Sequence, residues 1–155
     1  MINRLRETWN TGKPALNGWL AIPSTFSAEI MSHQNFDSIT IDLQHGLTDY
    51  SIAVPMMQAM SASDATMLCR VPWLEAGIIM KLLDAGAMGI ICPMINSREE
   101  AEKFVGATLY SPKGYRSSGP VRANVIHPDY HNSANDQIIS LAMIETEQAV
   151  ENAEA

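Results

Sequence analysis

The chain has few basic residues, few cysteines and no long apolar run, and each shortage excludes a class of function. Ten Lys and Arg against 17 Asp and Glu give a net charge of -7. This argues against a nucleic-acid partner, because phosphate-binding surfaces need a basic excess. No apolar run reaches the roughly 20 residues of a membrane helix, so we expect no membrane-spanning segment. The first ten residues lack the apolar region of a signal peptide.

Common nucleotide and zinc motifs are also missing. The sequence contains no G-x-x-x-x-G-K-[ST] loop and no Cys/His cluster with zinc spacing. Its two cysteines, Cys69 and Cys92, both lie within apolar segments, so we predict buried free thiols rather than a disulfide. Free thiols agree with a reducing compartment, and we expect a cytoplasmic protein.

The sequence does contain short apolar segments that alternate with helix-like segments. With 155 residues, 46% of them hydrophobic, the chain can bury the core of one domain. Strands are predicted at residues 18–22, 36–42, 66–71, 89–94 and 138–144. Helices are predicted at residues 24–34, 49–62, 75–84, 97–109 and 146–153. This alternation is typical of an α/β fold with right-handed crossovers and a mostly parallel sheet.

One segment interrupts the alternation. Residues 110–135 show neither helical nor strand periodicity and are predicted to form a long loop. Lys113, Arg116 and Arg122 lie there among Gly, Ser and Pro, with no acidic residue from 111 to 123. In an acidic chain, such a basic loop indicates contact with an anionic ligand or a neighbouring subunit. A solvated surface loop is the alternative.

Polar residues end three of the predicted strands, where parallel α/β folds place their chemistry. After the second strand, Asp42 can hold the imidazole of His45 as a general base, although this spacing more often gives a structural histidine. Arg70 ends the third strand and either pairs with Asp42 or Glu145 or binds a substrate carboxylate or enolate. Glu145 ends the fifth strand as a metal ligand, a base or the first acidic residue of a helix.

Five segments together resemble, in order and spacing, the HpcH/HpaI aldolase family. They are IDLQHG at 41–46, CRVPW at 69–73, IMKLLDAGA at 79–87, KGYRSSGP at 113–120 and MIET at 143–146. The resemblance covers the chain from about residue 18 onward. It implies a cytoplasmic class II aldolase, a metal-dependent carbon–carbon lyase of the EC 4.1.2 type that acts in aromatic compound catabolism. Its substrate is a 4-hydroxy-2-oxo acid, which it cleaves to pyruvate and an aldehyde.

The resemblance also implies a TIM (β/α)8 barrel. A complete barrel has about 250 residues, so residues 1–155 are expected to be the N-terminal part of one barrel domain, with about five of its eight β/α units. Open sheet edges would then invite pairing or aggregation. We expect little aldolase activity from these residues alone, and a homo-oligomer for the complete protein.

For the acid/base chemistry, the resemblance implies three residues. His45, supported by Asp42, is the acid/base group, and Arg70 contacts the keto oxygen and stabilises the enolate. Positive charge at that point suits the negative charge that develops as the carbon–carbon bond breaks.

For the metal, the resemblance implies Glu145 as one of two carboxylates that hold Mg²⁺, Mn²⁺ or Co²⁺, with the second carboxylate absent from this chain. Oxygen ligands suit such hard ions. Gln44 and Met143 join Arg70 as expected substrate contacts. Met143 departs from the family pattern, since many members have glutamine at this position.

Two alternatives to the aldolase hypothesis stay open. A lyase acting on a CoA thioester, in the manner of citrate lyase β-subunits, would suit the basic segment from Lys113 to Arg122, whereas the Asp42/His45 pair favours the aldolase. The other alternative is a non-catalytic fragment or assembly module that binds complete barrels through open sheet edges.

Overall fold

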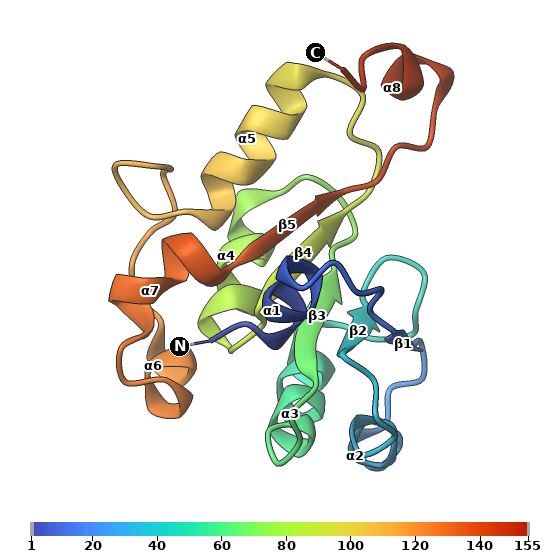
Figure 1. Ribbon diagram of the computed structural model, residues 1–155, viewed down its shortest axis with the longest axis vertical. Coiled ribbons are helices and arrows are strands. Elements are labelled where there is room, and N and C mark those ends of the chain that lie inside the picture. The colour runs from blue at the N-terminus through green and yellow to red at the C-terminus, as the bar shows by residue number, and fades with distance from the viewer. Residues whose placement is uncertain (1, 155) are drawn as a thin grey trace.

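Five parallel strands form one sheet in which neighbours in sequence are also neighbours in space (Figure 1). The strands are β1 (Asn17–Leu20), β2 (Ser38–Asp42), β3 (Thr66–Arg70), β4 (Gly89–Cys92) and β5 (Ile139–Ala142). The structure is a computed structural model that describes residues 2–154. The parallel pairing confirms the predicted α/β fold, and the consecutive order is that of strands in a (β/α) barrel.

A helix follows each strand, and a polar side chain starts it. The five helices are α2 (Thr25–Ser32), α3 (Tyr50–Met60), α4 (Ala76–Asp84), α5 (Arg98–Thr108) and α8 (Glu147–Glu151). Their N-cap residues are Ser24, Asp49, Glu75, Ser97 and Thr146, and each side chain accepts a hydrogen bond from a backbone N–H of the first turn. These bonds satisfy donors that a helix start leaves free, which explains where the chain turns from strand exit to helix.

Three further helices were not predicted from the sequence. They are α1 (Arg4–Asn10), α6 (Val121–Ile126) and α7 (Tyr130–Gln137). The prediction of a long loop over residues 110–135 is therefore wrong, since α6 and most of α7 lie within it. Both helices are short, and α7 is largely polar, so neither has the apolar stripe by which a helix is recognised in a sequence.

The basic residues of this segment bind groups of the chain itself. Arg116 is buried and forms an ion pair with Asp84 at the end of α4. Arg122 donates to the backbone carbonyl of the residue that follows α4. Lys113 forms an exposed ion pair with Asp136, 2.7 Å apart. Two of the three cations thus anchor the 110–137 segment to α4 rather than facing a ligand.

One face of the sheet, here called the outer face, packs against the helices and forms the main core. Its strand residues include Ile39, Ile41, Met67, Cys69, Ile90 and Cys92, and its helix residues include Met56, Met57, Leu82, Leu83 and Phe104. The two cysteines are free and buried, as predicted, and burial raises the pKa of each thiol to about 12. Among residues 2–154, no helix is long and apolar enough to cross a membrane.

The opposite face of the sheet, here called the inner face, is covered in part by α1, which lies in front of β3 and β4 in Figure 1. Leu5 of α1 packs against Leu68 and Ile139, and its backbone N–H donates to Thr66 Oγ1 at 3.1 Å. Because side chains alternate between faces, the inner face also receives Asp42 and Arg70 at the strand exits.

Candidate active site

Asp42 and Arg70 form a two-bonded ion pair at the exits of β2 and β3. The two residues are register partners, so their side chains leave the sheet side by side. Arg70 Nε donates to Asp42 Oδ1 at 2.9 Å, and Nη2 donates to Oδ2 at 2.6 Å. The side chain of Arg70 is only 13% exposed, and that of Asp42 is only 4% exposed. Of the possibilities that the sequence leaves open for Arg70, pairing with Asp42 is therefore confirmed.

The surroundings keep both members of the pair charged. Burial alone would raise the pKa of Asp42, but hydrogen bonds from Arg70, from Trp19 and from the backbone N–H groups of Gln44 and His45 lower it well below its ordinary value of 3.8. The hydrogen bond to Asp42 in turn raises the pKa of Arg70, and the negative charge of Glu145 adds to this. The pair is thus a fixed dipole rather than a titrating group near neutral pH.

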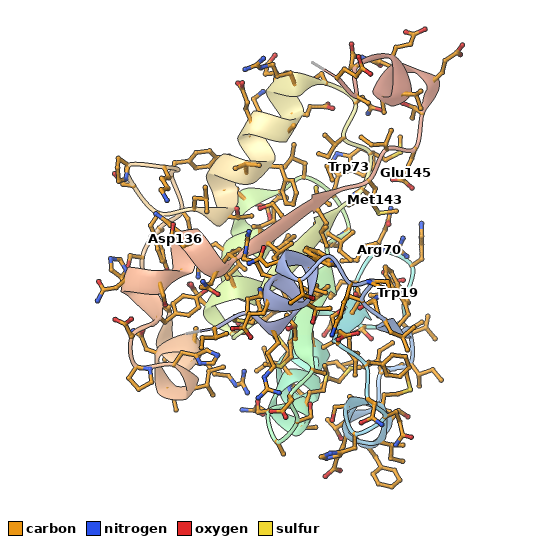
Figure 2. The ribbon with its side chains drawn as sticks, in the orientation of Figure 1. Trp19, Arg70, Trp73, Asp136, Met143 and Glu145 are labelled. Carbon is orange, nitrogen blue, oxygen red and sulfur yellow. The ribbon has the colours of Figure 1, made fainter. Side chains whose placement is uncertain are left out.

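Trp19 on β1 completes this cluster and was not identified from the sequence. Its indole Nε1–H donates to Asp42 Oδ2 at 3.2 Å, and the centre of its ring lies 4.9 Å from Arg70 Cζ. Figure 2 shows Trp19 and Arg70 next to each other at the strand exits. Side chains of a strand alternate between the two faces of its sheet, and this alternation in β1 places Trp19 on the face that also carries Asp42 and Arg70. This pattern could have identified Trp19 from the sequence.

The loop after β2 holds His45 by its backbone rather than by its ring. The backbone N–H groups of Gln44 and His45 donate to Asp42 Oδ1 at 3.0 and 3.3 Å. The side chain of His45 is exposed, and none of the hydrogen bonds in the described chain joins its ring to Asp42. The expected support of the imidazole by Asp42 is not seen, because the carboxylate oxygens already accept bonds from Arg70, Trp19 and the loop backbone.

Two other residues define the shape of this loop. At Gly46, an added Cβ would lie 2.2 Å from the backbone oxygen of Asp42, so only glycine fits the tight turn. Gln44 is half-buried, and its Oε1 is buried without a hydrogen-bond partner among the described residues. A buried amide oxygen of this kind is free to accept a bond from a ligand or water.

Glu145 follows β5 and is oriented by the neighbouring loop after β4. Its Oε2 accepts a hydrogen bond from the backbone N–H of Met94 at 2.8 Å. Met94 has a left-handed backbone with φ of 56°, which is uncommon for a residue other than glycine. The side chain of Glu145 is exposed, and none of the ion pairs in the described residues includes it.

Asn96 links the two loops that meet at Glu145. Its side chain donates to the carbonyl of Met94 at 2.8 Å and accepts a hydrogen bond from the hydroxyl of Thr146. Its backbone carbonyl accepts a bond from Asn152 Nδ2 at 2.9 Å. The left-handed turn at Met94 and the position of Glu145 are therefore fixed by the same side chain.

Figure 2 places Trp19, Arg70, Met143 and Glu145 at the same end of the sheet, with Trp73 beside Glu145. The structure thus gathers the expected residues Asp42, Arg70 and Glu145 around the strand exits, and leaves His45 on the exposed loop beside them. Between residues 2 and 154, no three His, Cys, Asp or Glu side chains lie close enough together to hold a metal ion. Glu145 alone does not fit the metal cage that the family resemblance implies.

Comparison with known proteins shows the family to which the chain belongs. Residues 18–155 match the family model described as HpcH/HpaI aldolase/citrate lyase. The chain is 42% identical to "Hydroxypyruvate/pyruvate aldolase" of Rhizorhabdus wittichii over 152 residues, which are 97% of this chain and 61% of that protein. It is 32% identical to "4-hydroxy-2-oxo-heptane-1,7-dioate aldolase" of Salmonella paratyphi C, covering 98% of this chain and 59% of that protein.

The fold is also that of solved structures. An HpcH/HpaI aldolase/citrate lyase family protein from Burkholderia cenocepacia J2315 superimposes with a TM-score of 0.89 and 26% identity, covering 98% of this chain and 63% of that one. In each comparison the chain spans about 60% of the length of its relative.

Proposed function

Because this chain belongs to the HpcH/HpaI aldolase/citrate lyase family, we propose that it forms part of a carbon–carbon lyase that cleaves 4-hydroxy-2-oxo acids to pyruvate and an aldehyde. The observation that supports this proposal best is the Asp42–Arg70 pair, which presents a fixed guanidinium at the strand exits. The names of two relatives, an aldolase of hydroxypyruvate and pyruvate and an aldolase of a 4-hydroxy-2-oxo diacid, support the same chemistry.

In this proposal Arg70 stabilises the enolate of pyruvate. Its Nε and one hydrogen of Nη2 are bonded to Asp42, which leaves Nη1 and the second hydrogen of Nη2 for a ligand. As the bond between C3 and C4 of the substrate breaks, its electron pair moves toward the keto oxygen. A guanidinium already held in place stabilises that developing charge without reorganising.

His45 moves the protons. The imidazole takes the proton of the C4 hydroxyl, the C3–C4 bond breaks, and the aldehyde leaves. The remaining enolate accepts this proton at C3 from the imidazolium and becomes pyruvate, so atoms and charge balance. An exposed imidazole on a loop held by Asp42 suits this exchange, because it can reach both substrate and water.

Glu145 is proposed as one ligand of a divalent ion, Mg²⁺, Mn²⁺ or Co²⁺, with the other protein ligands supplied from outside this chain. Such an ion supplies Lewis-acid polarisation of the keto oxygen when bound. Gln44 and Met143 are proposed substrate contacts, the first through its buried amide oxygen and the second through an apolar thioether. We also propose that the whole protein forms a homo-oligomer.

Neither alternative function gains support. The CoA-thioester lyase was favoured by the basic segment from 113 to 122, but Arg116 and Arg122 are bonded within the chain. The assembly module was favoured by the free edges of β1 and β5, which any sheet of this kind possesses.

The test measures, by proton NMR, how fast the methyl protons of pyruvate exchange with D₂O in the presence of added Mn²⁺. The complete protein that contains these residues is expected to exchange the protons faster than buffer with Mn²⁺, and Arg70→Met in that protein to reduce the excess rate by at least about tenfold. Arg98→Met is the matched control, since Arg98 lies on the exposed side of α5. Exchange at the buffer rate, or equal rates for both variants, would contradict the proposal.

A further inference from the structure

Trp19 makes two different contacts with the Asp42–Arg70 pair. The indole N–H is bonded to Asp42 Oδ2, the same oxygen that accepts from Arg70 Nη2. The ring itself lies beneath the guanidinium, 4.9 Å from Cζ to the ring centre. A guanidinium over an indole face is attracted by the ring electrons, most strongly where water is excluded.

Core packing does not explain this tryptophan. Trp19 is 43% exposed, and it is a member of neither hydrophobic cluster among the described residues. Its neighbours on β1, Gly18 and Leu20, are buried, and Leu20 belongs to the main core of the outer face. Trp19 is the register partner of Thr40, which lies two residues before Asp42 on the same face of the sheet. The long side chain of Trp19 therefore reaches along the sheet to the ion pair.

We infer that Trp19 is a positioning residue that holds the Arg70 guanidinium in the orientation needed for an anion. The inference rests on the proposed function, in which Arg70 binds the enolate. The two bonds from Arg70 to Asp42 fix one edge of the guanidinium, and the backbone N–H groups of the loop after β2 hold the carboxylate itself, but none of these bonds covers a face of the guanidinium. The Trp19 ring covers one face of the guanidinium and its N–H holds Asp42, while Nη1 makes no hydrogen bond among the described residues.

The experiment follows the Arg70 Nε–H directly by NMR in the ¹⁵N-labelled full chain, with the signal assigned through Arg70→Lys. Trp19→Phe keeps an aromatic face but removes the N–H donor, and Trp19→Leu removes both. Trp73→Leu is the matched control, because Trp73 is exposed at the same end of the sheet. The hydrogen-exchange rate of Arg70 Nε–H is expected to rise several-fold in Trp19→Phe and about tenfold in Trp19→Leu, with Trp73→Leu unchanged.

Exchange rates unchanged in both Trp19 variants would overturn the inference, and so would a rapidly exchanging Nε–H in the unchanged protein. If Trp19→Leu fails to fold, as judged by circular dichroism, the Phe variant alone decides. Titration with oxalate, a planar analogue of the enolate, separates the two proposals. If oxalate leaves the Arg70 signal unmoved while the exchange rates follow the expected order, the anion-binding role of Arg70 fails and the positioning by Trp19 stands.

Discussion

The outer and inner faces of the sheet come from alternate residues of the same strands, yet they are stabilised in different ways. Ile41 and Cys69 on the outer face are fully buried by apolar contacts, which have no required direction. Asp42 and Arg70, the next residues along the same strands, are nearly as buried but depend on directed bonds between charges. An outer residue that is shortened leaves a small cavity. Removing Asp42 or Arg70 from the inner face leaves a buried charge without its partner, which costs far more.

The largest effect is expected for the substitution Asp42→Ala. Because Arg70 would lose both of its bonds to a carboxylate, the free energy of unfolding is expected to fall by about 3–5 kcal/mol. Urea denaturation followed by circular dichroism measures it. The double variant Asp42→Ala/Arg70→Met should recover part of the loss, since it removes the unpaired charge as well. A loss below about 1 kcal/mol in the single variant would contradict the comparison.

Acid should remove the contribution of the inner face selectively. The pKa of Asp42 is lowered in the folded protein, so its stabilisation is complete above the unfolded value and is lost as the pH falls toward the folded one. The difference in unfolding free energy between the unchanged protein and Asp42→Asn is therefore expected to shrink from about pH 5 downward. Asp136→Asn is the control, because Asp136 pairs with Lys113 at the surface, where solvent screens the charges. An equal pH dependence for the two variants would refute this expectation.

A smaller effect is expected at the loops that hold Glu145. Asn96→Ala removes the bonds to Met94 and Thr146, at a cost of about 1–2 kcal/mol. Hydrogen exchange should show faster exchange at the backbone N–H of Met94, which is bonded to Glu145. Asn132→Ala, which loses one exposed bond to Asp129, provides the control. Unchanged exchange at Met94 would mean that Asn96 does not hold the turn.

The smallest effect is expected on the outer face. Ile41→Val removes one methylene from the main core and should cost about 0.5–1.5 kcal/mol, with no dependence on pH. Thermal and urea unfolding at two pH values measure it. If this variant lost as much stability as Asp42→Ala, the distinction between the two faces would fail.

The sequence predicted the outer face well and the inner face poorly. Residues 67–69 and 90–92 are apolar, so the strands and the buried Cys69 and Cys92 follow from the sequence pattern. The partner of Arg70 does not follow, because a strand-end arginine is equally compatible with Asp42, Glu145 or a ligand. Only the register of β2 against β3 decides between them.

The prediction of a long loop over residues 110–135 failed for a different reason. The helices α6 and α7 are held by bonds to distant parts of the chain, such as that of Arg122 to the carbonyl after α4, and not by a stripe of their own. Trp19 was missed because its role depends on two strands that follow it in sequence. The expected Asp42–His45 contact was drawn from proximity in sequence, whereas the bonds run to the backbone of the loop.

The two cysteines of the outer face are natural probes of local opening in the core. A buried thiol with a raised pKa reacts with a labelling reagent only when its surroundings open, so the rate of labelling reports that opening. Cys69 and Arg70 are adjacent on β3, with one side chain beneath the helices and the other in the ion pair. The labelling rate of Cys69, compared with that of Cys92 on β4, would thus report how often β3, the strand that carries the guanidinium, separates from its helices. This measurement requires no substrate.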